Sequence, residues 1–323
     1  MRSRFLPVFL AGLLFALGGC AVATLRDPAA AYEQHLGAAF AAFQKGDTGA
    51  ATRSLDQAAD MATLLYLTRS VACGQIAQRL LEAGRTAEAA QFLARALRDP
   101  DRGVAWDPWL WGVLADAWRK IDDQKQARQA MAEAEVRAEA ILASIGNAGA
   151  DEPEAGRPGA VRRLLQASRY FLESRDDVPR ALRALREAVR RDPDNPEALN
   201  ALGYALADEG KTTAEFQEAL ELTRKALRLA PGNPMIMDSV GWALFKTGDL
   251  AGARRLLREC VDAVPDEPEI RYHLGVVYAQ QGRTAEAHTE LSRALVLKRD
   301  YPEARRALDL LRQAPGEGVV EDA

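Results

Sequence analysis

Small and apolar residues return along the C-terminal part of this chain with a period of 34 residues. The period leads from Val240-Gly241 to Leu274-Gly275, and one more period leads to Leu308. Other positions match between the two full units, namely Leu244, Ala253 and Leu257 in the first and Tyr278, Ala287 and Leu291 in the second. A fixed period of this length is typical of helix pairs that stack side by side and cover each other's apolar faces.

Each recurring residue type has a mechanical role in such a helix pair. The glycine after the first apolar landmark and the alanine near the start of the second helix leave room for the two helices to approach closely. A proline such as Pro265 ends the second helix, because proline has no amide proton and disfavours helix in the residue before it. Turns between the paired helices are predicted at Gly248-Asp249 and at Gly282-Arg283.

The same pattern continues towards the N-terminus. One unit opens at Leu202-Gly203 and ends near Pro231, and another runs from Leu165 to Pro193. Weaker copies cover residues 38–58, 76–96 and 111–134, and a last helix is predicted from Pro302 to about Arg312. The chain holds 62 alanines and six isoleucines, which favours helices over strands. We therefore predict an all-α solenoid of about six helix pairs, closed by a C-terminal capping helix.

The recurring positions are similar to those of the tetratricopeptide repeat, which places Leu-Gly, Tyr, Ala, Leu, Ala and Pro at comparable offsets. The resemblance spans residues 32 to 312 and is strongest from 195 to 300. It implies a helical solenoid that binds other proteins and carries out no chemistry itself. The alternative is a helical bundle of another kind in which alanine and leucine recur by accident.

The first twenty residues have the pattern of a secretion signal. Arg2 and Arg4 precede an apolar run of 13 residues, Phe5 to Leu17, which is short for a membrane span but typical of a signal-peptide core. The run ends in Leu17-Gly18-Gly19-Cys20, which resembles the lipobox of bacterial lipoproteins. That resemblance implies cleavage before Cys20 and acylation of Cys20, with palmitate among the chains. Ala21 resembles the residue found in outer-membrane lipoproteins, so we expect an outer-membrane anchor facing the periplasm. An ordinary signal peptide is the alternative.

These features predict six segments. They are a signal peptide at 1–19, a lipidated tether at 20–31, an N-terminal block of three degenerate repeats at 32–145, a Gly/Pro-rich loop at 146–160, a C-terminal block of three repeats and a capping helix at 161–314, and a tail at 315–323.

The residues that carry catalysis or bind metals are sparse. The three histidines, His35, His273 and His288, form no HExxH motif or close pair, so no metal site is expected. Cys73 and Cys260 occupy packing positions of the repeat and are predicted to be buried free thiols. Gly210-Lys211-Thr212 lacks the first glycine of a phosphate-binding loop and is predicted to be a turn. We expect no catalytic residue and no cofactor.

The net charge of −4, with no basic block, gives no support to nucleic-acid binding. The resemblance to tetratricopeptide repeats implies a protein or peptide as the partner. In tetratricopeptide repeats the first helix of each pair lines a concave groove, and this resemblance assigns a set of candidate groove residues. They are Asn200, Tyr204, Asp208, Asp238, Trp242, Phe245, Lys246, Tyr272 and His273, with Trp109 in a similar place further back. Aromatic side chains among polar ones are common at recognition surfaces. The alternative is that these rings pack between adjacent repeats.

The sequence thus predicts a lipid-anchored, periplasm-facing scaffold that binds a partner protein or peptide in its groove and acts in cell-envelope assembly. Two alternatives remain open. One is a structural lipoprotein that associates with itself as a homodimer, and the other is an enzyme whose site has no recognised motif.

Overall fold

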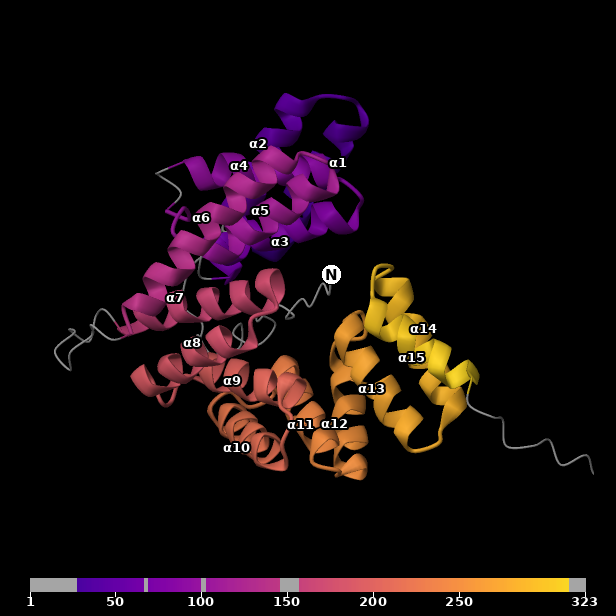
Figure 1. Ribbon diagram of the computed structural model, residues 1–323. Helices are drawn as coiled ribbons and strands as arrows, with labels where there is room; N and C mark the ends of the chain where they lie inside the picture. Colours follow the sequence, from indigo (N-terminus) through magenta and orange to yellow (C-terminus); the bar gives the residue numbers. More distant parts are fainter. Residues whose placement is uncertain (1–27, 67–68, 100–102, 146–156, 314–323) are drawn as a thin grey trace, which may run out of the picture. The chain divides into compact units, whose positions relative to one another are not determined.

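All regular elements in the described part of the chain are helical. The computed structural model describes residues 28–66, 69–99, 103–145 and 157–313 (Figure 1). The predicted signal peptide, Cys20 and the tail at 315–323 lie outside these residues. The described residues divide into two compact units, with the division between Ala188 and Val189.

The N-terminal unit, up to residue 188, consists of eight α-helices and one π-helical turn in its described part. They are α1 (Pro28–Gln44), α2 (Thr48–Tyr66), α3 (Arg69–Glu82), α4 (Thr86–Arg98), α5 (Pro108–Lys120), α6 (Gln124–Ala143), α7 (Arg157–Tyr170), η3 (Phe171–Arg175) and α8 (Val178–Arg191), whose last three residues belong to the second unit. Helix α7 begins inside the stretch 146–160 that was predicted to be a loop, and residues 146–156 of that stretch are outside the described part.

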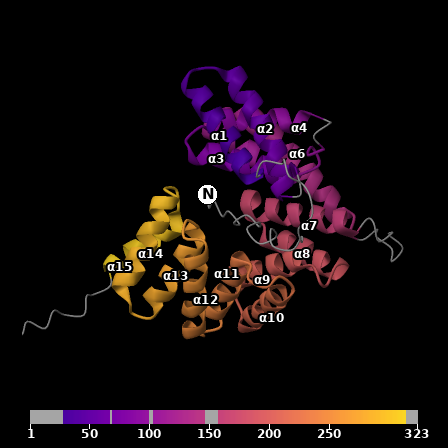
Figure 2. The same cartoon turned by 180° about the vertical axis from the view of Figure 1, so that it is seen from behind.

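The C-terminal unit consists, in its described part, of seven further helices. They are α9 (Pro196–Glu209), α10 (Thr213–Leu229), α11 (Pro234–Lys246), α12 (Leu250–Ala263), α13 (Pro268–Gln280), α14 (Thr284–Leu297) and α15 (Pro302–Gln313). In both views α9 and α10 lie at one end of this unit, and α14 and α15 lie at the other (Figures 1 and 2).

The helices of each unit stack as pairs. First helices pack on their own second helices, as α9 does on α10, and second helices pack on the next first helix, as α10 does on α11. Successive first helices also touch one another, so that α9 meets α11 and α11 meets α13. This is the predicted solenoid arrangement. The described residues hold seven successive helix pairs and the final helix α15. These pairs correspond to the seven units found in the sequence, so the predicted total of about six was one too few.

The ends of the helices follow from their local sequences. Asn233 precedes Pro234, and its side chain accepts hydrogen bonds from the amides of Met235 and Ile236, which would otherwise lack partners at the helix start. The turn between α11 and α12 contains Gly248 at φ 92°, a left-handed conformation that glycine adopts without strain. Asp249 then caps α12 through the amide of Gly252. The predicted Gly-Asp turn is therefore confirmed.

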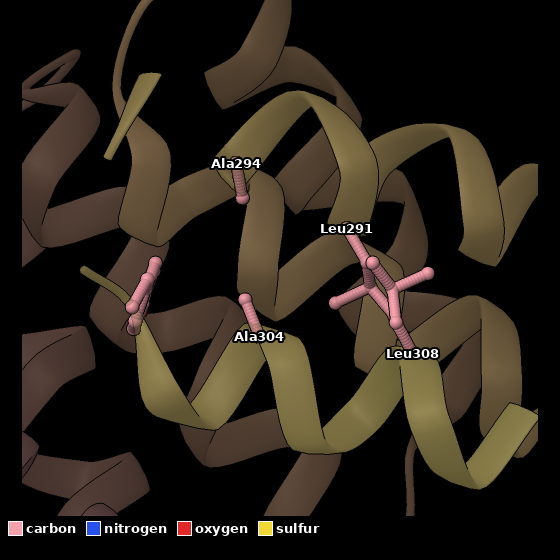
Figure 3. Packing of buried hydrophobic residues seen from close by; sticks show 5 residues of the cluster. Leu291, Ala294, Ala304 and Leu308 are labelled. Atoms are coloured by element: carbon pink, nitrogen blue, oxygen red, sulfur yellow. The ribbon is translucent and has the colours of Figure 1, made fainter. Parts of the chain in front are cut away.

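Close approach of the paired helices depends on small residues at their interface. A Cβ placed on Gly241 would lie 2.7 Å from Cγ of Leu257, and one placed on Gly275 would lie 2.7 Å from Cγ of Leu291. At the end of the stack, Ala294 of α14 faces Ala304 of α15, and Leu291 meets Leu308 (Figure 3). Helix α15 thus covers the apolar face of the last pair, as predicted for a capping helix.

Replacing Gly275 by alanine should destabilise the C-terminal unit. The new methyl group overlaps Leu291, and overpacking outweighs the better helix propensity of alanine, for a net loss of about 1–2 kcal/mol. Urea unfolding followed by far-UV circular dichroism measures this. Gly37→Ala is the control, because an added Cβ at that exposed position in α1 meets no atom within 4 Å, and it should stabilise by about 0.5–1 kcal/mol. Equal stability of Gly275→Ala and wild type would contradict the interface described here.

Candidate functional site

The first helices of three successive pairs bring most of the predicted groove residues together. Tyr204 lies on α9, Asp238 and Trp242 lie on α11, and Tyr272 and His273 lie on α13. Because α11 touches both α9 and α13, side chains from all three helices meet in one group. We call this group the acid–aromatic cluster; it consists of Tyr204, Asp238, Trp242, Phe245, Glu269, Tyr272, His273 and Tyr301.

A buried ion pair lies at the centre of the cluster. Nδ1 of His273 is 2.9 Å from both carboxylate oxygens of Asp238, and each residue is only 1% exposed. Burial alone would lower the pKa of His273, but the adjacent carboxylate of Asp238 outweighs that effect and the pKa is raised. The charged pair therefore joins α11 to α13 through groups that solvent does not reach.

Trp242 forms the aromatic part of the cluster. Its ring stacks on His273 at a centroid distance of 4.3 Å and on Phe245 at 4.9 Å, with interplanar angles below 20°. The ring of Tyr272 is 6.2 Å away. The ammonium group of Lys246 lies 5.0 Å from the Trp242 centroid, which is within the range of a cation–π contact.

Glu269 belongs to the cluster although it was not predicted. It lies one turn before His273 on α13, and Oε1 of its carboxyl group accepts a hydrogen bond from the hydroxyl of Tyr204. Burial raises the pKa of Glu269 to about 8, against the opposing effects of His273 and Tyr204. Burial also raises the pKa of Tyr204 well above its usual value, and the charge of Glu269 adds to this.

The cluster extends to the last helix through Tyr301, which was also not predicted. Its ring lies 5.2 Å from that of Tyr272 and its own exposure is 7%. The ammonium group of Lys298 lies 4.5 Å from the Tyr301 centroid. Tyr301 precedes α15, beyond the last full repeat, so the offsets of the repeat gave no signal for it.

Two buried polar atoms near the cluster have no hydrogen-bond partner in the described structure. They are Nε1 of Trp242 and Oδ1 of Asn200, in side chains that are 4% and 3% exposed. An unpaired buried donor or acceptor costs about 1–3 kcal/mol. Such atoms are uncommon in stable interiors, and they mark this region as one that lacks polar partners.

The predicted groove residues fall into two sets. Asn200, Asp238, Trp242 and His273 are buried, whereas Tyr204, Asp208, Phe245, Lys246 and Tyr272 are half-buried. The contacts of Trp242 with His273 are contacts between adjacent repeats. Trp109 is 2% exposed and its indole N–H donates to Glu173 at 2.6 Å inside the N-terminal unit, so it does not line a groove in this structure.

The cysteines and the Gly210-Lys211-Thr212 segment have structural roles. Cys73 and Cys260 are buried free thiols, as predicted. Gly210-Lys211-Thr212 forms the turn before α10, where Thr212 and Glu215 cap the helix reciprocally. Within the described ranges, no group of His, Cys, Asp and Glu side chains has the arrangement of a metal site. In the same ranges, no helix combines the length and the apolar character needed to cross a membrane.

Comparison with known families identifies the repeats. Tetratricopeptide repeat family models match residues 165–234 and 244–314. The chain therefore contains tetratricopeptide repeats, as the recurring residues predicted. Proteins built from these repeats are generally scaffolds for protein–protein interaction rather than enzymes.

Two bacterial relatives and one solved structure are similar to this chain. A TPR repeat-containing protein of Pseudomonas aeruginosa is 35% identical over 197 residues, covering 61% of this chain and 29% of the relative. Cellulose synthase operon protein C of Pseudomonas fluorescens is 27% identical over 231 residues, covering 70% of this chain and 17% of the relative. The chain thus spans less than a third of either relative. A tetratricopeptide repeat protein from Parabacteroides merdae shares the fold, with a TM-score of 0.51, 12% identity and coverage of 88% of this chain and 99% of that one.

Removing the carboxylate of Asp238 should destabilise the C-terminal unit strongly. Asp238→Ala leaves His273 buried without its partner, and breaking a buried pair in this way costs about 3–5 kcal/mol. Denaturant unfolding of the full chain measures the loss. Asp266→Ala is the control, because its side chain is 77% exposed, and it should stay within about 0.5 kcal/mol of wild type. Equal effects of the two substitutions would show that the buried pair contributes nothing.

Proposed function

We propose that this protein is a lipid-anchored scaffold of the bacterial cell envelope that binds an extended or helical segment of a partner protein along the first helices of its C-terminal repeats. The observation that carries the proposal is the acid–aromatic cluster, in which three successive repeats present aromatic and polar side chains together with an indole N–H that lacks an acceptor.

The half-buried members of this region supply the contact surface. Phe245 and Tyr272 offer aromatic area, and Lys246 offers a cation close to Trp242. Aromatic side chains with a buried base and an accessible edge provide much of the binding energy at protein interfaces. A peptide backbone supplies the alternating acceptors and donors that Trp242 and Asn200 lack.

The proposed lipid anchor is supported by the sequence of the first twenty residues. An apolar run followed by Leu17-Gly18-Gly19-Cys20 supports acylation of Cys20 and, with Ala21, an outer-membrane location facing the periplasm. Two or more acyl chains hold a protein at a membrane durably, whereas one holds it marginally. Anchoring would raise the effective concentration of the repeats for partners attached to the same membrane.

Replacing Lys246 and Tyr272 together by alanine should weaken capture of the partner by roughly tenfold or more, because two contact side chains are lost. Chemical crosslinking and affinity purification from envelope extract, quantified for the same crosslinked protein, measure this. The matched control is Arg255→Ala with Arg258→Ala, which changes exposed side chains on α12.

Undiminished capture by the Lys246 and Tyr272 variant would contradict the assignment of this surface. Sedimentation velocity on the same proteins distinguishes a homodimer, because self-association would make a second copy the captured partner. A monomer at micromolar concentration excludes that alternative.

Replacing Cys20 by serine should release the protein from membranes. The variant keeps the apolar run but has no thiol to acylate, so it should fractionate with soluble proteins and its N-terminal peptide should lack fatty acid. Cys73→Ser is the control, because Cys73 is buried in α3, and it should remain with the membrane. Fatty acid on the N-terminal peptide of Cys20→Ser would refute the anchor.

A further inference from the structure

The hydrogen bond between Tyr204 and Glu269 joins two repeats that are not neighbours. Tyr204 lies on α9 and Glu269 lies on α13, and 65 residues separate them. The helix pair α11–α12 comes between these two in the stack. In a repeat solenoid each unit ordinarily contacts only its immediate neighbours. This bond therefore crosses a whole repeat.

The residues beside this crossing bond are the buried centre of the cluster. His273 lies 6.1 Å from the ring of Tyr204 and holds both Asp238 and Trp242 on the intervening helix α11. The indole N–H of Trp242 is unpaired there. The crossing bond thus spans helix α11, which carries one buried donor without a hydrogen-bond partner.

The hydrogen bond between Tyr204 and Glu269 is weak enough to break while the rest of the chain stays folded. A single intramolecular hydrogen bond contributes about 0.5–1.5 kcal/mol to the folded state. The unpaired polar atoms of Trp242 and Asn200 reduce the stability of the closed arrangement further. Local opening of this kind occurs in folded proteins without global unfolding.

We propose that the Tyr204–Glu269 hydrogen bond is a strap that holds the inner face of α11 closed, and that the strap opens when the partner segment binds Trp242 and Asn200. This inference rests on the proposed function for the identity of the bound segment. The strap itself is a property of the chain alone and is tested without any partner.

The protonation state of Glu269 determines whether the strap is closed or open. The ionisable groups that interact with Glu269 are Tyr204 on α9, Asp238 on α11, Tyr272 and His273 on α13, and Lys298 and Tyr301 before α15. Asp208 on α9, Cys260 on α12 and Glu303 on α15 interact with other members of the cluster. Burial holds the pKa of Glu269 at about 8, whereas a carboxyl group in water has a pKa of about 4.3.

The closed state therefore binds a proton that the open state releases. Protonation of Glu269 stabilises the closed state relative to the open state. This stabilisation is complete below a pH of about 4.3 and is lost as the pH rises through about 8, so opening increases towards alkaline pH. Between these values each pH unit shifts the opening equilibrium by up to about tenfold. The raised pKa of His273 acts in the same direction, because its protonated form is also favoured in the closed state.

Hydrogen–deuterium exchange of the full chain, read from peptides covering α11, tests the strap. Tyr204→Phe keeps the ring but removes the bond, and it should speed exchange in α11 by about fivefold, the equivalent of one hydrogen bond of about 1 kcal/mol. Tyr301→Phe is the matched control. It removes a tyrosine hydroxyl from the same cluster that makes no hydrogen bond in the described structure, and it should leave exchange in α11 unchanged.

The pH dependence provides a second readout. Exchange in α11, corrected for the intrinsic rate, should rise from about pH 6 to about pH 9 in wild type and should rise much less in Glu269→Gln, whose amide accepts the same bond but does not ionise. Unchanged exchange in Tyr204→Phe, or a wild-type pH response in Glu269→Gln, would overturn the strap. If both exchange results are as expected but no partner protein is captured, the proposed function is refuted and the inference about the strap still stands.

Discussion

The structure depends on the close approach of paired helices, which glycine and alanine permit at fixed positions. Gly241 and Gly275 have no room for a side chain against Leu257 and Leu291, so each pair packs in the same way as the one before it. This repetition places successive first helices side by side. Residues about 34 positions apart in the chain consequently become neighbours, and polar side chains on adjacent first helices can pair, as Asp238 and His273 do.

The periodic positions made much of this architecture predictable. The landmarks located the helix pairs and turns, and they placed Asp238, Trp242 and His273 on first helices whose side chains meet. The period does not specify how deeply a side chain is buried. That depends on rings from the adjacent repeat, as when Trp242 stacks on His273 and becomes inaccessible.

Residues that the sequence reasoning missed lie where the repeat pattern carries no information. Glu269 follows Pro268 in the first turn of α13, the ordinary place for an acidic residue at a helix start, so nothing in the pattern distinguished it. Its partner Tyr204 is two repeats away. Sequence offsets between neighbouring repeats cannot reveal a bond that crosses an intervening one.

Side chains on separate repeats act as one buried group in this structure, as Asp238 and His273 do. A double-mutant cycle with Asp238→Ala, His273→Ala and the combined variant, measured as free energies of unfolding, tests this most directly. The 2.9 Å separation and near-complete burial of the pair predict a coupling energy of about 1.5–3 kcal/mol. Effects that add to within about 0.5 kcal/mol would contradict the account, because they would mean that the two repeats do not share this charge pair.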